Sequence, residues 1–205
     1  MTLKSSLWQA LLMLTCHFVT GCNAQENSKV TNWQPNVALV STTNILWGTE
    51  TNHVKAGLNI QYASDSSNRT LVGFFVVLYN NSDTNGNFSS NRLFLTFPPI
   101  RSIYTMTLCD DKMNVVPKTK IGKDFGQPFD TNPKKLDSHY GQRVLFPFQL
   151  DVLPVDPIVL ENYFDITNAG KYHLKFVLNT LMRTDAQGTQ PFYLPVDADI
   201  EIKKP

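Results

Sequence analysis

The chain has few charged side chains, and their signs nearly cancel. Asp, Glu, Lys and Arg make up 17% of its 205 residues, and the formal net charge at pH 7 is +1. An average globular protein has about 25% charged residues. Nucleic-acid binding normally requires a strongly basic surface, and attachment to an anionic bilayer by charge alone requires a cluster of basic residues. The composition therefore predicts neither a nucleic-acid partner nor a polybasic membrane contact.

The chain also lacks an apolar run long enough to cross a membrane as a helix, which takes about 20 residues. The longest such run, Leu71 to Tyr79, is mainly β-branched and aromatic and has the length of a strand. An apolar stretch from Leu7 to Val19 is shorter, is interrupted by Gln9 and His17, and follows the positive charge of Lys4. This arrangement is typical of an export signal segment.

The residues that end this segment, Val19 to Cys22, resemble the lipobox of bacterial lipoproteins, in which a small residue precedes a cysteine that is lipidated and becomes the first residue. The resemblance implies that residues 1–21 are a signal peptide and that Cys22 carries the lipid. In lipoproteins of Gram-negative bacteria, Asn23 after the cysteine implies sorting to the outer membrane, and therefore a place in the cell envelope with the lipid as the membrane contact. Two alternatives stay open: secretion after ordinary cleavage behind Ala24, and a buried N-terminal helix.

Cysteines are too few for a disulfide scaffold. The three are Cys16, Cys22 and Cys109. Either cleavage removes Cys16, and either lipidation or cleavage takes Cys22, so Cys109 is left alone. A lone thiol in an oxidising compartment is usually buried and inert. We therefore predict a domain without an internal disulfide, which depends on a hydrophobic core that a chain of this size can supply.

Amphipathic helix patterns are absent, whereas strand patterns recur. Residues 22–36 are polar and are predicted to form a tether, and residues 37–205 a single domain. Apolar and polar residues alternate, as in half-buried strands, from Val54 to Tyr62, from Lys171 to Leu178 and from Val196 to Ile202. A strand is also expected from Val144 to Leu150, where Pro147 suits an edge or a bulge. Strands at this density, separated by turns rich in Pro and Gly, are typical of an all-β antiparallel sandwich.

The segment from Asp165 to Tyr172 resembles the tyrosine corner of immunoglobulin-like domains. In that motif a polar turn and a glycine, here Gly170, lead into a strand whose early tyrosine bonds to the backbone upstream. The resemblance covers only the C-terminal part and implies an immunoglobulin-like β-sandwich of the broader class, because the Cys and Trp pattern of antibody domains is absent. The alternative is an ordinary glycine turn before a strand with a surface tyrosine.

Residues 117–143 show few strand signals and are predicted to form a long loop, and loops beyond about 12–15 residues are often functional. Aromatic rings beside polar groups suit sugar or peptide binding. The candidate ligand-binding residues of this loop are Phe125, Phe129, Tyr140, Lys134 and Lys135. The simpler interpretation, which the sequence favours, is that the aromatic rings fix the loop to the sheets while the lysines are solvated.

No spacing in the sequence matches a zinc, calcium, serine-hydrolase or phosphate-binding motif. Asp110 with Asp111, and Asp197 with Asp199, could offer oxygen atoms to calcium, but calcium takes six to eight ligands. A solvated strand edge is the simpler interpretation. His139 is the one histidine that we would test for catalysis. We therefore predict no catalytic residue, no metal site and no cofactor.

Two further features allow both structural and functional interpretations. Trp47 with Gly48 is predicted to be core or an anchoring turn, with a ligand-stacking tryptophan as the alternative. The tripeptides that begin at Asn68, Asn80 and Asn87 fit the N-glycosylation acceptor, which matters only in a eukaryotic host.

Together these features predict a non-enzymatic, lipid-anchored envelope domain. It would bind an unidentified protein or glycan of the cell envelope through strand-connecting loops, chiefly residues 117–143. One alternative is a secreted hydrolase or a carbohydrate-binding accessory module, in which His139 meets Asp130, Asp137 or a serine in a pocket. The other alternative is a purely structural envelope protein without a soluble ligand.

Overall fold

The computed structural model describes residues 45–64, 70–82, 92–129, 141–153, 157–184 and 188–203, all within the compact unit Trp33–Pro205. Several predicted features lie outside the described residues and stay predictions. They are the signal peptide, the tether, Cys22, Lys134, Lys135, Tyr140, and the residues of the hydrolase alternative, Asp130, Asp137 and His139.

Within the described residues the chain forms strands and two one-turn helices. In chain order the elements are β1 (Ile45–Trp47), β2 (Val54–Ser64), β3 (Thr70–Asn80), β4 (Leu93–Phe97), β5 (Tyr104–Asp110), α1 (Lys120–Lys123), β6 (Gly141–Leu145), β7 (Leu150–Val152), β8 (Ile158–Val159), α2 (Leu160–Tyr163), β9 (Gly170–Thr184) and β10 (Gly188–Ile202). The predicted all-β class is confirmed for this part of the chain. Neither of its helices has the length and apolarity needed to span a bilayer.

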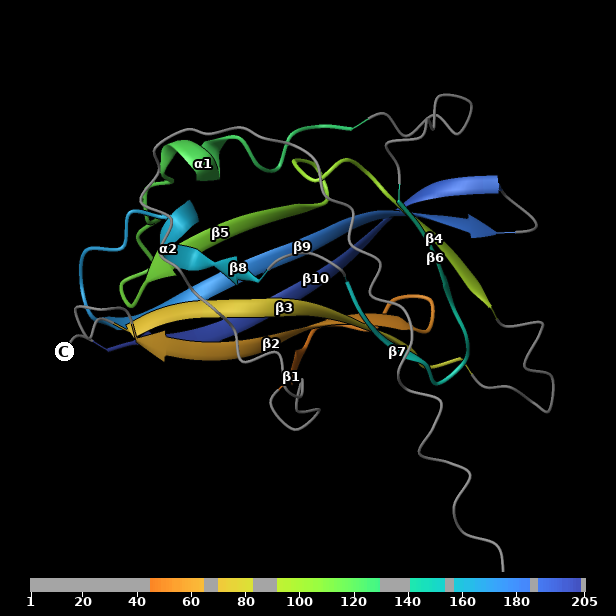
Figure 1. Cartoon of the computed structure of the whole chain (residues 1–205), viewed down its shortest axis with the longest axis horizontal. Coiled ribbons are helices and arrows are strands. Elements are labelled where there is room, and N and C mark those ends of the chain that lie inside the picture. The colour runs from red at the N-terminus through yellow and green to blue at the C-terminus, as the bar shows by residue number, and fades with distance from the viewer. Residues whose placement is uncertain are drawn as a thin grey trace, which may run out of the picture. The chain divides into compact units, whose positions relative to one another are not determined.

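The strands form two antiparallel sheets, each built on one long hairpin (Figure 1). In the first sheet β2 pairs with β3 along its whole length, β1 pairs with β2, and β7 and β8 share the other edge of β3. In the second sheet β9 pairs with β10 over fifteen residues, while β4 and β5 share the other edge of β9 and β6 pairs with β4. At about 3.3 Å per residue, β9 extends over roughly 50 Å.

The two sheets face each other across one hydrophobic core. Alternate residues of β2, β3, β9 and β10 contribute to it, including Leu58, Phe74, Phe176 and Leu194, each with no exposed surface. The rings of Phe74, from the first sheet, and Phe176, from the second, meet edge to face with centroids 5.7 Å apart. This inward alternation is what the period-two pattern of the sequence predicts.

Strand β3 is buried on both faces, as its continuous apolar sequence predicts. Leu71, Val72, Val77 and Leu78 are each at most 2% exposed, although successive side chains point to opposite faces. The strand is central, because β2 occupies one of its edges and β7 and β8 the other. A strand whose two faces are both covered needs apolar residues at every position rather than at every second one.

Two expected strands have different bounds in the structure, and proline explains both. The strand expected at Val144 to Leu150 is divided, since β6 ends at Leu145 and β7 begins at Leu150. Pro147 lies in the intervening turn, because it cannot donate to a ladder and its fixed φ suits a turn. The last strand begins at Gly188 rather than Val196, and its Pro191 and Pro195 are exposed on the edge strand, where a missing donor costs nothing.

The first part of the predicted long loop is attached to the rest of the domain through α1 and α2. Thr119 caps α1, accepting a hydrogen bond from Gly122 N at 3.0 Å. Its own amide donates to Tyr163 O at 3.0 Å, and its hydroxyl donates to Asn162 O at 2.5 Å. Residues 141–143, at the other end of the predicted loop, belong to β6. A one-turn helix is too short to produce a helical period in the sequence.

The close approach of α1 to α2 requires glycine at position 122. A Cβ atom there would lie 2.0 Å from the carbonyl oxygen of Tyr163. We expect Gly122→Ala to lower the free energy of unfolding by about 1–3 kcal/mol, because backbone must move. Gly141→Ala is the matched control, since nothing lies within 4 Å of its added carbon. Equal urea midpoints for the two variants would contradict this packing.

Candidate functional site

An open hollow of about 470 Å³ lies where β5 ends, β9 begins and β10 ends. We call it the acidic hollow. It is lined by Asp110, Asp111, Met113, Lys171, Tyr172, His173, Asp199, Ile200 and Glu201. Its lining carries four carboxylates against one ammonium group, so negative charge is in excess at neutral pH.

The register of β9 with its two neighbours assembles this hollow. Tyr172 stands opposite Asp110 of β5 on one side and opposite Ile200 of β10 on the other. Lys171 stands opposite Glu201 in the same ladder. The sequence presents Asp110 with Asp111, and Asp199, as separate acidic positions about ninety residues apart. Antiparallel pairing brings them to one place.

The lining of the acidic hollow combines apolar and charged side chains. Tyr172 and Ile200 are buried, and the side chain of Met113 is exposed beside them. The Tyr172 hydroxyl donates to Asn168 O at 2.7 Å, and burial, followed by the charge of Asp110, raises the pKa of this phenol. Exposed apolar side chains beside carboxylates fit an alkyl chain that ends in a cation.

Asp110 holds the turn at the edge of the hollow. Its carboxylate accepts hydrogen bonds from the backbone amides of Lys112 at 2.9 Å and Asn114 at 2.8 Å, and from Asn114 Nδ2 at 3.0 Å. The bonds from Asn114 lower the pKa of Asp110 below its ordinary value of 3.8. Asp110 therefore stays ionised at any pH near neutrality.

Removing the side chain of Asn114 should raise the pKa of Asp110, because the largest stabilising contact to the carboxylate is lost. A depressed pKa means that the ionised group stabilises the fold above the ordinary pKa and that this contribution is lost as pH falls through the lower, folded-state value. Carboxyl-carbon NMR titration of Asn114→Ala measures the change. Lys112→Ala, which removes the weakest contribution, should give a smaller rise. An unaltered titration in Asn114→Ala would refute this assignment.

His173 is oriented between two carboxylates of β10. Its Nδ1 lies 3.0 Å from Asp199 Oδ1, and its Nε2 lies 3.7 Å from Asp197 Oδ1. Among the lining residues, all in the described part of the chain, there is no Ser, Thr or Cys beside this imidazole. Cys109 stands opposite His173 in the ladder but is buried and does not line the hollow. In the described ranges no group of three or more His, Cys, Asp or Glu is arranged to hold a metal ion.

Phe125, a candidate from the predicted loop, packs against the domain rather than lining the hollow. Its ring stacks on Tyr104 with centroids 5.3 Å apart and meets Tyr163 edge to face at 5.0 Å. The Tyr104 and Tyr163 hydroxyls lie 3.0 Å apart, and burial raises the pKa of Tyr104. Phe129 is half-buried and does not line the hollow.

The residues of the predicted tyrosine corner lie at the start of β9. Gly170 has a φ of 151°, which favours glycine, and the amide of Asp165 donates to Pro117 O at 2.9 Å. Tyr172 belongs both to this corner and to the acidic hollow. Sequence reasoning missed Lys171, His173 and Glu201 as site residues. The sequence signal that could have identified them is their alternation with core residues, which places them on the strand face opposite the core.

Trp47 is half-buried on the face of the first sheet that points away from the core. The prediction that it is a core residue is therefore wrong. The reason is its register opposite Gly57, which leaves room for the ring. Trp47 lies 6.0 Å from Tyr79, with the Lys55 ammonium 4.8 Å from the Trp47 centroid. Gly48 does serve as an anchor, since a Cβ atom there would lie 1.9 Å from Pro195 O.

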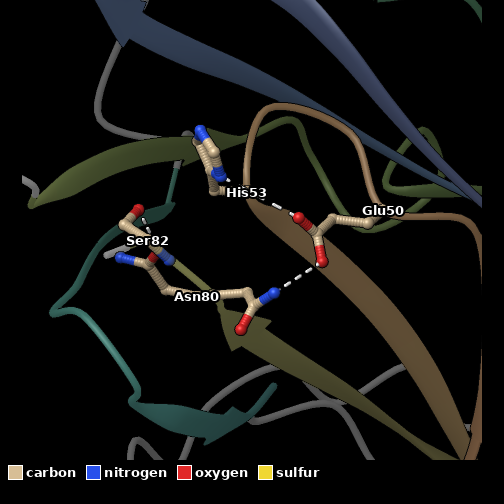
Figure 2. A network of polar contacts seen from close by, with 5 residues as sticks. Glu50, His53, Asn80 and Ser82 are labelled. Carbon is tan, nitrogen blue, oxygen red and sulfur yellow. Dashed lines mark hydrogen bonds and ion pairs between the residues drawn. The ribbon is translucent and has the colours of Figure 1, made fainter.

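A second polar network surrounds the turn before β2 and the end of β3 (Figure 2). His53 has a φ of 63° in a turn closed by hydrogen bonds between Thr51 and Val54, and its carbonyl accepts from Asn81 N at 2.6 Å. Its imidazole Nδ1 lies 3.9 Å from Glu50 Oε1. Exposed groups at this separation contribute little energy, so we assign this network to turn structure.

Comparisons of the chain with protein-family models, with curated proteins and with solved structures gave no significant match.

Proposed function

We propose that the protein is an exported, lipid-anchored domain of the bacterial cell envelope that binds a basic segment of a partner protein in the acidic hollow and does not catalyse a reaction. The segment 1–21 and Cys22 motivate the export and the lipid anchor. The observation that carries the binding function is the meeting of four carboxylates, two at the end of β5 and two on β10, in one hollow that also has apolar lining residues.

We also propose that the two sheets form an immunoglobulin-like sandwich. Two observations support it: the antiparallel pairing within both sheets, and the hydrogen bond from the Tyr172 hydroxyl to Asn168 O. This architecture commonly presents its binding residues at the ends of its strands, where the acidic hollow lies.

A lysine or arginine side chain matches both parts of the hollow. Its methylene groups can pack on the exposed side chain of Met113, while its cation reaches the carboxylates of Asp111, Asp199 and Glu201. Because the hollow is open to solvent, we expect its affinity for a cation to be modest and to fall as salt is added. At physiological ionic strength, salt screens charges over a distance of about 8 Å.

A protein partner is favoured over a glycan. Glycan binding uses aromatic rings whose faces are available to the sugar, whereas Tyr172, the tyrosine that lines the acidic hollow, is buried. The acidic hollow instead offers charge, which glycans without amino groups cannot match. Binding of a neutral oligosaccharide in place of a basic peptide would reverse this choice.

The test is binding of fluorescently labelled oligolysine to the full chain, with oligoglutamate as the negative probe. The variant Asp111→Asn, Asp199→Asn and Glu201→Gln removes three carboxylates and keeps Asp110, which holds the turn. Exposed ion pairs are each worth about 0.2–1 kcal/mol, so we expect about tenfold weaker binding.

The control variant makes the same change in net charge elsewhere. Glu50→Gln, Asp124→Asn and Asp165→Asn neutralise three exposed carboxylates that do not line the hollow. Its affinity for oligolysine should stay within about twofold of the original. Equal weakening in both variants, or no binding to the unaltered chain, would reject the hollow as the binding site.

A further inference from the structure

The turn between β6 and β7 presents two exposed phenylalanines. Phe146 is 47% exposed and Phe148 is 53% exposed, on either side of Pro147. Exposed Phe94 of β4 stands opposite exposed Val144 of β6 in the adjoining ladder. We call these four apolar side chains the aromatic tip.

The conformation of this turn is unusual for its sequence. Phe148 has a φ of 57°, a region in which a bulky residue is a genuine outlier and where glycine or asparagine is the ordinary choice. Such outliers persist where the surroundings enforce them, and they cluster at functional positions. A phenylalanine in this conformation, with its ring exposed to solvent, supports a role for the ring outside the fold.

Buried Asn80, at the end of β3, holds the turn in place. Its carbonyl accepts from Phe148 N at 2.7 Å, its amide donates to Gln149 O at 3.1 Å, and its Nδ2 donates to Leu145 O at 3.1 Å. Its Oδ1 in turn accepts from Ser82 N at 3.0 Å, and Figure 2 shows these two residues in contact. The aromatic tip is therefore presented on a rigid support and loses little entropy on binding.

Two arginines lie beside the aromatic tip. The Arg92 guanidinium lies 5.9 Å from the Phe146 ring centroid, and Arg183 stands opposite Phe94 in the adjoining ladder. Exposed aromatic rings next to cations match the interface of a bilayer with anionic lipids, where rings occupy the headgroup boundary and each cation gains from the surface potential.

We infer that the aromatic tip inserts into the headgroup region of an anionic bilayer, a contact additional to the lipid anchor of the proposed function, on which it rests. Strand β9 runs from the acidic hollow to the aromatic tip. Tyr172 lines the hollow and Arg183 lies at the tip, so the two are separated by eleven residues of strand, roughly 36 Å. With the tip in the bilayer, the hollow is held at the far end of β9 and is accessible to a partner.

The experiment labels the tip with an environment-sensitive fluorophore in the lipidated full chain, bound to phosphatidylglycerol-containing vesicles. Phe146→Cys and Phe148→Cys each supply a labelling site, and Tyr62→Cys is the control, an exposed aromatic position on β2. Cys109 is buried and Cys22 is consumed by lipidation, so labelling is selective. We expect both tip labels to shift to shorter wavelength and to be quenched by nitroxide lipids but not by iodide, unlike the control label.

The outcomes separate the two proposals. If the chain binds the vesicles but its tip labels behave like the control label, the proposed insertion is wrong and the lipid anchor stands. Chain that fails to sediment with vesicles overturns both. A tip-label shift that persists in pure phosphatidylcholine, or that is unchanged between about 0.1 M and about 0.5 M NaCl, contradicts the role of the arginines. A shift without vesicles that depends on protein concentration identifies a second copy as the occupant and overturns the proposal.

Discussion

Replacing Phe176 with alanine should lower the free energy of unfolding by about 3–5 kcal/mol, the usual cost of emptying a large aromatic site in a core. Phe176 has no exposed surface. Its ring meets Phe74 of the opposite sheet and Tyr104 of its own sheet, each with centroids 5.7 Å apart. The truncation therefore removes contacts across and within the sheets together. Urea unfolding followed by circular dichroism measures the change.

Phe94→Ala is the matched control for this prediction. It makes the same chemical change in the same sheet, but Phe94 is 43% exposed and lies on the opposite face. Surface substitutions of this kind usually change stability by about 0.5 kcal/mol or less. If the two variants unfolded at the same urea concentration, the two sheets would not share the core described above.

Replacing Asn80 with leucine should lower the free energy of unfolding by about 3 kcal/mol, although the two side chains are similar in size. The change removes the donor to Leu145 O and the acceptor for Ser82 N, and a buried polar group left without a partner costs about 1–3 kcal/mol. The β6–β7 turn should loosen as well, because Asn80 also joins it through backbone hydrogen bonds. Thermal unfolding should show the loss as a midpoint lower by roughly 10 °C.

The neighbouring Asn81 supplies the control, since it is the same residue type but exposed, with its Nδ2 2.9 Å from Glu50 Oε2. Asn81→Leu should lower the midpoint by about 2 °C or less. A larger loss in Asn81→Leu than in Asn80→Leu would contradict the assignment of Asn80 as the support of the turn. Burial and hydrogen bonding also make Asn80 an unsuitable glycosylation acceptor in the folded chain, whereas Asn68 and Asn87 lie outside the described residues.

Local patterns in the sequence were sufficient to predict the strands of the central hairpins. Alternation predicts β2 and β9, and the continuous apolar run predicts β3, because one-sided and two-sided burial leave different signatures. The early part of β10 was missed because Pro191 and Pro195 argue against a strand, and only its position at a sheet edge makes them acceptable. Helices of one turn leave no periodic signal, so α1 was not predicted, and at residues 158–166, which include α2, the sequence allows either a strand or a short helical turn.

The candidate site could be predicted only in pieces. Asp110, Asp111 and Asp199 were considered as possible calcium ligands and Tyr172 as part of a tyrosine corner, but nothing local indicates that they share one hollow. Their meeting depends on the registers of β5 with β9 and of β9 with β10, which are set by the whole core. Phe125 was selected because it is an aromatic residue in a long loop with many polar side chains. Its stacking on Tyr104 depends on a contact between segments that the sequence does not link.

The measurement that tests the central proposal most directly is NMR mapping of the isotope-labelled chain during titration with oligolysine. Binding in the acidic hollow predicts that the largest amide shifts fall on residues 110–113, 171–173 and 199–201, and that they diminish when salt is added. Shifts spread evenly over exposed carboxylates, or concentrated on residues 117–129, would contradict the account and place the binding site elsewhere.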